Sequence, residues 1–376
     1  MKEGFQQTLD NYDFTRLNEL SRCEDVEVVR QHLASAKYPK TGLETFALLI
    51  SPAASHLLEE MAQKSSQLTS ERHGKVIRLY APAYISNECT NTCTYCGFTM
   101  ENKINRKSLD ANEMKSEAEY LNKRGFRQLL IVSGEHQKIV TSEYVCSMVE
   151  QSRPYFSSVA IETAPFKTHE YEALVTAGVD SLTLYQETYD RETYAAVHLR
   201  GKKKDYDYRL AAPERGGEAR MRKLNMGVLL GLSPDWRLDS IKCALHLDWM
   251  MKKYWRMQYA ISLPRLCESE TDYQPAVEVQ DKEIVQLVMA WRLAFPDLGV
   301  NISTREPDYL RDGLIGLGVT HMSAESSTEP GGYCTPDTAL KQFDITDERS
   351  VDEVIQIIES RGHEAVWKDW DPCMLG

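Results

Sequence analysis

Three cysteines stand at a spacing suited to a metal cluster. Cys89, Cys93 and Cys96 form a C-x3-C-x2-C pattern. Three thiolates can hold three irons of a four-iron, four-sulfur cluster and leave the fourth iron without a protein ligand. Such an open iron can coordinate a small molecule and pass an electron to it. The alternative is a zinc site with a fourth ligand from elsewhere, but His73 and His136, the nearest histidines, are not at the usual tight spacing.

Two arginines, Arg265 and Arg305, follow directly on stretches that resemble β-strands. A guanidinium group binds a carboxylate through two parallel hydrogen bonds. Either arginine could therefore hold the carboxylate of an amino-acid-like ligand. The alternative is a structural ion pair with Glu187 or Glu306. The sequence favours a ligand role for Arg305 and leaves both roles open for Arg265.

Eight short apolar or β-branched runs recur from residue 75 onward, with amphipathic helical stretches between them. The runs span 76–85, 126–133, 158–163, 181–186, 224–232, 259–263, 300–304 and 319–323. Eight β-α repeats predict an α/β fold of the (βα)8 TIM-barrel type, whose active site forms at the carboxyl ends of the strands. A doubly wound sheet is the alternative. The cysteine pattern begins just after the first run, where this fold places its chemistry.

The chain divides into three predicted parts. Residues 1–74 are a helical N-terminal extension, residues 75–326 form the barrel, and residues 327–376 form a short C-terminal cap with one helix at 352–360. A longer polar connection follows the fourth strand and is expected to be an elaborated loop. Its three lysines at 202–204 predict a solvated segment, with a docking site for an acidic electron carrier as the alternative.

The composition argues against several classes of partner. The 376 residues carry a net charge of −12, which disfavours nucleic acid and an anionic membrane surface. No apolar run approaches the ~20 residues that span a bilayer, and the N-terminus lacks the apolar core of a secretion signal. We therefore expect a cytoplasmic protein. Of the nine cysteines, the six outside the pattern are expected to be buried, reduced thiols.

The cysteine pattern, placed after the first strand and with Tyr95 before its last cysteine, resembles the radical S-adenosylmethionine (SAM) superfamily. The resemblance implies a [4Fe-4S] cluster on Cys89, Cys93 and Cys96. In that superfamily SAM chelates the open iron through its amino and carboxylate groups. An electron from the cluster then cleaves SAM and forms a 5′-deoxyadenosyl radical, which needs a site sealed from water.

The resemblance also implies cofactor-binding residues at later strand ends. Where the superfamily often has Gly-Gly-Glu after the second strand, this chain has Ser133, Gly134 and Glu135. Gly134 and Glu135 would contact the ammonium group of SAM, and the alternative is an ordinary strand-to-helix turn. Glu162 and Glu187 end the third and fourth strands and would also contact SAM. A structural salt bridge is the alternative for Glu162, because a buried acid needs a partner.

Longer strings resemble one family, the 2-iminoacetate synthases, which are the tyrosine lyases of anaerobic-type thiamine biosynthesis. These strings lie at 51–55, 93–98, 133–136, 185–189, 201–203, 303–306, 330–333 and 367–370. The family cleaves the Cα–Cβ bond of L-tyrosine to 2-iminoacetate (dehydroglycine) and 4-cresol. The resemblance implies that Arg305 anchors the tyrosine carboxylate with help from Ser303, and that Arg265 contacts SAM.

The family resemblance further implies two protein partners, a thiazole synthase subunit and a flavodoxin- or ferredoxin-type reductant. There are three alternatives to a tyrosine lyase of this family, and the last of them is disfavoured. A tryptophan-lyase-like enzyme would use another aromatic amino acid, and a non-catalytic iron–sulfur or zinc protein would cleave nothing. The hydrogenase-maturation tyrosine lyases carry a second cluster in a C-terminal extension, and Cys334 and Cys373 are too few to hold one.

Overall fold

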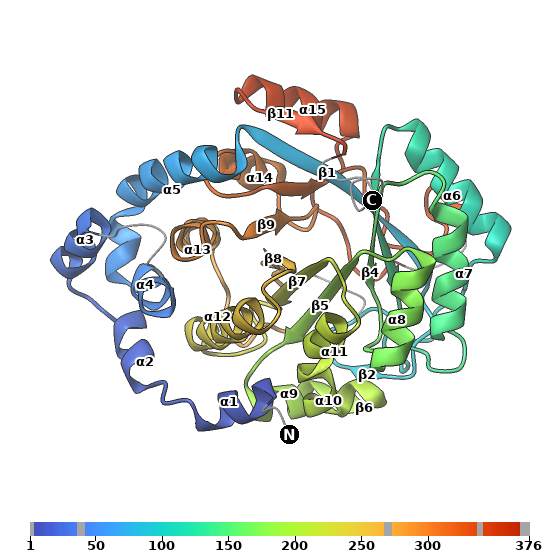
Figure 1. Ribbon diagram of the computed structural model, residues 1–376, viewed down its shortest axis with the longest axis horizontal. Helices are drawn as coiled ribbons and strands as arrows, with labels where there is room; N and C mark the ends of the chain where they lie inside the picture. Colours follow the sequence, from blue (N-terminus) through green and yellow to red (C-terminus); the bar gives the residue numbers. More distant parts are fainter. Residues whose placement is uncertain (1–3, 36–41, 267–272, 337–340, 369–376) are drawn as a thin grey trace.

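The computed structural model describes residues 4–35, 42–266, 273–336 and 341–368, and its centre is a closed barrel of eight parallel strands (Figure 1). The strands are β1 (Val76–Ser86), β3 (Gln128–Ser133), β4 (Ser158–Glu162), β5 (Ser181–Glu187), β7 (Lys223–Val228), β8 (Gln258–Ser262), β9 (Gly299–Ile302) and β10 (His321–Ser323). Neighbours pair in that order, and β10 pairs with β1 to close the barrel. The predicted TIM-type fold is confirmed.

Helices surround the barrel between successive strands (Figure 1). They include α6 (Ala111–Lys123), α7 (Ser142–Ser152), α8 (Thr168–Ala177), α12 (Trp236–Lys253), α13 (Asp281–Ala294) and α14 (Asp308–Leu314). In α6, Asp110 caps the first turn, and Met114, Ala118 and Leu121 are buried. Their spacing of three and four residues puts them on one face of the helix, so local sequence is enough to seat this helix on the barrel.

The connection between β5 and β7 is mostly helical, so the expected loop is wrong in this respect. It contains α9 (Arg191–Val197), the short strand β6 (His198–Arg200), the 3-10 helix η2 (Lys202–Lys204), α10 (Tyr206–Leu210) and α11 (Ala212–Glu218). Strand β6 pairs antiparallel with β2 (Thr92–Cys93), which lies inside the cysteine pattern. A segment about 100 residues further along the chain therefore supports the cysteines directly.

Both ends of the chain pack against the barrel. The N-terminal helices are α1 (Phe5–Asn11), α2 (Thr15–Ser21), α3 (Val26–Ser35), α4 (Leu43–Leu49), η1 (Ala53–His56) and α5 (Leu58–His73), drawn in blue in Figure 1. Phe46 of α4 lies 4.3 Å from Trp291 of α13, measured between ring centroids. Near the other end, α15 (Val351–Ser360) leads into β11 (Glu364–Val366), which pairs with the start of β1. The division of the chain at residues 74 and 326 stays a prediction.

In the described ranges, no helix is long and apolar enough to cross a membrane. Among the cysteines outside the pattern, Cys243 is buried as expected, whereas Cys23 and Cys146 are half-buried. The expectation of burial is wrong for Cys334, which is exposed. Cys267 and Cys373, like residues 369 and 370 of the last family-like string, lie outside the described residues.

Candidate active site

The thiols of Cys89, Cys93 and Cys96 line one cavity at the carboxyl end of the barrel, with about 580 Å³ of empty space. We call it the cysteine cavity. None of the three is in a disulfide. Gly134 and Glu135 line the same cavity, so the structure brings the end of the second barrel strand to the cysteine pattern, as the sequence predicts. No three histidine, cysteine, aspartate or glutamate side chains in the described part of the chain converge on a single metal ion, whereas in a four-iron cluster each thiolate binds a different iron.

The loop that carries the cysteines is held in shape by other groups. The guanidinium of Arg106 donates to the backbone carbonyls of Asn87 (2.6 Å), Phe98 (2.9 Å) and Thr99 (2.8 Å). Gly97 packs so closely on the C-terminal segment that an added Cβ would lie 2.5 Å from the carbonyl oxygen of Gln342. The thiols are therefore presented to the cavity by a loop whose path is already determined by packing.

The donor chemistry fits an iron–sulfur cluster. Burial, together with the nearby Glu135, raises the pKa of Cys89 to about 11. Burial also raises the pKa of Cys93, partly offset by the Lys203 ammonium. Such thiols stay protonated at neutral pH unless bound cations stabilise the thiolate. The side-chain amide of Gln342 donates to the Cys96 sulfur at 3.8 Å, the kind of contact that tunes cluster potentials.

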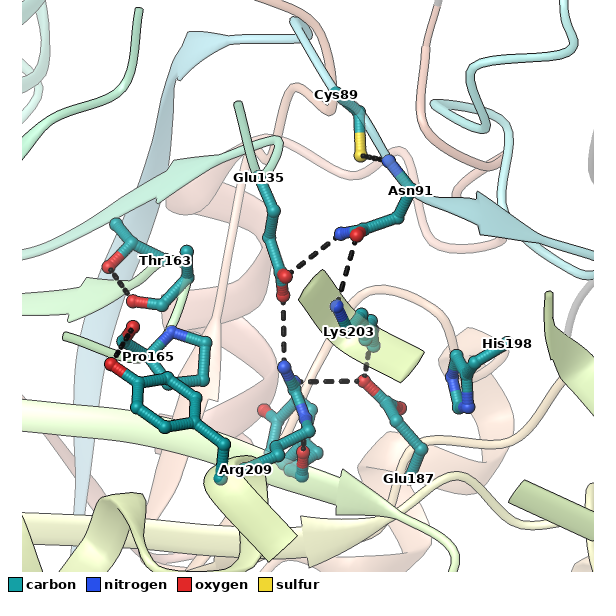
Figure 2. Close-up of polar contacts among 12 residues, drawn as sticks. Cys89, Asn91, Glu135, Thr163, Pro165, Glu187, His198, Lys203 and Arg209 are labelled. Carbon is teal, nitrogen blue, oxygen red and sulfur yellow. Dashed lines mark hydrogen bonds and ion pairs between the residues drawn. The ribbon is translucent and has the colours of Figure 1, made fainter. Parts of the chain in front are cut away.

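Beside the cysteines lies a buried network of four charges (Figure 2). Arg209 donates to Glu135 at 2.9 Å and to Glu187 at 3.2 Å, and Lys203 donates to Glu187 at 2.7 Å. The second carboxylate oxygen of Glu135 accepts a hydrogen bond from the side chain of Asn91 at 2.9 Å. All four charged side chains are at most 13% exposed. Two carboxylates thus face two cations, and the network is balanced in charge.

Burial alone would raise the pKa of Glu135, but Arg209 and Lys203 lower it below its usual value. The pKa of Glu187 is lowered in the same way, against the effect of burial. Both acids are therefore carboxylates at neutral pH. Glu187 owes its position to a bulge: the register of β5 against β7 shifts between Tyr185 and Glu187, and Glu187 has a φ of 71°.

A second cavity lies beside the first and contains Arg305 and Ser303; we call it the arginine cavity. The guanidinium of Arg305 lies 3.5 Å from the centroid of the Phe343 ring. No carboxylate of the described residues lies within ion-pair distance of it. Ser303 accepts a weak hydrogen bond from the Arg305 backbone N–H at 3.5 Å. Arg305 is thus a cation held by an aromatic face, and its guanidinium makes one weak hydrogen bond, to the Arg265 carbonyl at 3.5 Å.

Glu162 lies where the two cavities meet. It lines the cysteine cavity, the arginine cavity and a third cavity that also contains Gln342 and Arg305. Burial raises the pKa of Glu162 to about 7, although Arg305 acts in the opposite direction. Within the described residues its carboxylate has no hydrogen-bond or ion-pair partner. The structure therefore does not show the salt bridge that was the alternative role for Glu162.

Arg265 is the predicted site residue that the structure does not bring to these cavities. It donates to Glu306 at 3.1 Å, to Asp281 at 2.8 Å and to the carbonyl of Val279 at 2.9 Å. It lines none of the three cavities. These contacts correspond to the structural pair that was the alternative to a ligand role.

Ser133 and Gly134 shape the wall of the cysteine cavity. The Ser133 hydroxyl is buried with no hydrogen-bond partner, so it is available to a ligand in that cavity. Gly134 donates its backbone N–H to Ser86 at 2.8 Å, and an added Cβ would lie 2.3 Å from the carbonyl oxygen of Glu88. Only glycine fits this contact with the chain itself.

Sequence reasoning missed several residues of the site, namely Asn91, Lys203, Arg209, Gln342 and Phe343. The prediction of a solvated segment is wrong for Lys203, which is buried against Glu187. No local pattern marks Arg209, because its partners lie 74 and 22 residues away in the chain. The two acids at strand ends, Glu135 and Glu187, were the available signal, because a buried carboxylate needs a nearby cation.

Comparisons with known proteins agree with this geometry. The family model for the radical SAM superfamily matches residues 83–244, and that for the biotin and thiamin synthesis associated domain matches residues 257–364. The chain is 42% identical to the 2-iminoacetate synthases of Salmonella typhimurium and of Escherichia coli, in each case over 86% of both chains. Among solved structures it is similar to HydG, a maturase of the [FeFe]-hydrogenase, with a TM-score of 0.88, 29% identity and coverage of 96% of this chain and 80% of that chain.

Proposed function

This chain belongs to the 2-iminoacetate synthase family of the radical SAM superfamily, and we propose that it cleaves the Cα–Cβ bond of L-tyrosine to 2-iminoacetate and 4-cresol. One observation carries the proposal beyond family membership. The cysteine cavity and the arginine cavity adjoin, and Glu162 borders both. A cofactor on the cysteines and an amino acid on Arg305 would therefore lie next to each other, as a radical transfer between them requires.

The cysteine cavity supports the cofactor part of the proposal. Cys89, Cys93 and Cys96 would hold the [4Fe-4S] cluster, and the cluster with bound SAM would supply the adenosyl radical. The backbone at Gly134 and the free hydroxyl of Ser133 line the wall that SAM would face. Glu135 accepts hydrogen bonds from Arg209 and Asn91, so it would meet SAM as a carboxylate already fixed in orientation.

Further polar groups around that cavity have related proposed roles. Glu162 would accept hydrogen bonds from SAM, because its carboxylate lines the cavity and has no protein partner among the described residues. Glu187 lines the cavity as well, but its charge is engaged by Lys203 and Arg209. We propose that it acts on the cofactor mainly by keeping those two cations in place. Arg265 would act on Glu306, a residue of the arginine cavity wall.

The arginine cavity supports the substrate part. Arg305 would bind the tyrosine carboxylate, with Ser303 as a second contact, and the Phe343 ring limits how far the guanidinium can turn. Tyr80 and Tyr84 add aromatic surface to the same cavity. Holding the substrate by one end restricts which of its hydrogens meets the radical, and the barrel wall keeps water away.

Two partners and a location complete the proposal. The product imine hydrolyses readily, so direct transfer to a thiazole synthase subunit is expected. Each SAM cleavage needs one electron, which a flavodoxin- or ferredoxin-type reductant would supply. We place the protein in the cytoplasm, where thiols stay reduced.

The test uses anaerobically reconstituted enzyme reduced with dithionite and supplied with SAM and L-tyrosine. We expect 4-cresol and 5′-deoxyadenosine. The Arg305→Ala variant should still cleave SAM but lose tyrosine turnover, whereas Arg256→Ala, an exposed arginine at the other end of the barrel, should behave like wild type. Absence of both products with the cluster present would end the proposal, as would turnover of L-tryptophan in place of tyrosine. Unchanged turnover in Arg305→Ala would place the carboxylate elsewhere.

A further inference from the structure

The strand that contains Cys93 pairs with a strand that has an exposed apolar residue. In the β2–β6 pair, Cys93 lies opposite His198 and Thr92 opposite Arg200. His198 is fully buried, and its ring lies 2.8 Å from the Tyr95 hydroxyl. Leu199 points the other way and is 47% exposed. Strand β6 therefore connects a solvent-exposed side chain to the strand that contains one of the predicted cluster ligands.

A second exposed apolar residue lies on the loop that carries the cysteines. Met100 is 49% exposed, and its backbone N–H donates to the carbonyl of Asn91 at 2.9 Å. Gly201 approaches that loop so closely that an added Cβ would lie 2.7 Å from the carbonyl oxygen of Thr90. The segments 100–103 and 199–204 thus both rest on the cysteine loop. Their exposed side chains, which we call the β6 face, are Met100, Glu101, Lys103, Leu199, Arg200, Lys202 and Lys204.

The β6 face is basic on an acidic protein. Four of its seven residues are cations and one, Glu101, is an acid, while the chain as a whole carries a charge of −12. Glu101 reaches Arg200 only at 3.6 Å, and both side chains are more than half exposed, so this pair is mostly screened by solvent. Exposed apolar side chains among charged ones are typical of a surface that binds another protein transiently.

We propose that the β6 face docks a small acidic one-electron carrier protein, which reduces the cluster held by the three cysteines. The inference rests on the proposed function, which requires one electron for each SAM cleaved. The carrier is oxidised by one electron and the cluster is reduced by one, with no bond made or broken. Electron transfer weakens steeply with distance, so the carrier must dock close to the cysteines, and strand β6 pairs with the strand that contains Cys93.

Charge alone would allow a different docking site, which makes the inference testable. A groove lined by Arg153, Arg220, Arg222, Lys253 and Arg256, with Trp255 exposed at 72%, is also basic. It borders Asp180, Arg222 and Met257, which directly precede β5, β7 and β8. The groove therefore lies at the amino ends of the strands, away from the cysteines. A carrier bound there would be too far from the cluster to reduce it efficiently.

The experiment compares Arg200→Glu/Lys204→Glu on the β6 face with Arg220→Glu/Arg256→Glu in the groove. Turnover of tyrosine is driven either by dithionite or by recombinant flavodoxin with its reductase, and binding of flavodoxin to the holoenzyme is measured separately by fluorescence anisotropy. We expect the β6-face variant to keep dithionite-driven turnover and to lose about tenfold or more in flavodoxin affinity and flavodoxin-driven kcat/KM at low salt. The groove variant should match wild type in every assay.

Each other outcome is decisive. The inference is overturned if the groove variant loses flavodoxin binding. It is also overturned if both variants bind flavodoxin as well as wild type does. If the double variant fails to incorporate its cluster, Lys204→Glu alone, on an exposed side chain, should still weaken flavodoxin binding severalfold, and no weakening overturns the inference. Failure of the proposed function gives a different result. The wild-type enzyme would then form no products even with dithionite, whereas the flavodoxin affinities of the two variants could still be measured and compared.

Discussion

Replacement of Arg209 by methionine should destabilise the protein more than any surface change. Arg209 is the guanidinium shared by Glu135 and Glu187, with a side chain 6% exposed. Methionine keeps most of the apolar volume but removes the charge. Lys203 is then the one network cation left for two buried carboxylates, so one negative charge is uncompensated in a region of low dielectric.

The magnitude follows from the geometry. Two charges about 4 Å apart interact by about 4 kcal/mol at an effective dielectric constant near 20. Breaking a buried ion pair by removing one partner costs about 3–5 kcal/mol in measured cases. We therefore expect Arg209→Met to lower the free energy of unfolding by about 3–5 kcal/mol. By contrast, Arg22→Met breaks the exposed pair with Asp235 and should cost about 1 kcal/mol or less.

The assay is urea unfolding of the chain followed by circular dichroism, with the midpoint compared at constant slope. A second variant tests the charge-balance argument itself. Arg209→Met/Glu187→Gln removes one charge of each sign and leaves Glu135 facing Lys203, so it should be more stable than Arg209→Met by about 2 kcal/mol, an interaction between neighbouring sites. The reasoning is refuted if the double variant is less stable than Arg209→Met, or if Arg209→Met unfolds within 1 kcal/mol of wild type.

Three further predictions concern single positions. Burial raises the pKa of Glu162 to about 7, and protonation removes its charge, so the affinity for SAM should fall by up to about tenfold when the pH is lowered from 8 to 6. Equilibrium dialysis should show a smaller fall in affinity for the Glu162→Gln variant. Equal falls in wild type and variant would contradict a contact between Glu162 and the cofactor. Burial raises the pKa of Asp239 from 3.8 to about 7. Between these two pH values the folded state holds a proton that the unfolded state has released, so the free energy of unfolding falls as the pH rises through this range. Wild type should therefore lose stability relative to Asp239→Asn between pH 5 and pH 7, as urea unfolding would show, and a constant difference would refute this. Gly134→Ala places a Cβ 2.3 Å from the Glu88 carbonyl oxygen and should lower the iron and sulfide content per chain, while Gly313→Ala, with no atom within 4 Å, should not.

The barrel was predictable because its signals are local. The strands are short apolar or β-branched runs, and a helix such as α6 repeats its apolar residues every three or four positions, so elements such as β3 and α6 can be recognised without their neighbours. The connection after β5 was not predicted as helical. Its helices α10 and α11 are only 5 and 7 residues long, and their stability comes from contacts with the barrel rather than from their own sequence.

The cysteine pattern and the glycine at position 134 could be recognised in the chain because a metal cluster and a tight turn constrain residue type at short spacing. Which acid pairs with which cation could not be predicted in this way. Arg265 and Arg305 have equivalent positions in the sequence, yet the first is held by Glu306 and the second opens into a cavity. Which carboxylate reaches which cation depends on how strands and connections far apart in the chain are brought together, and this the tertiary structure alone decides.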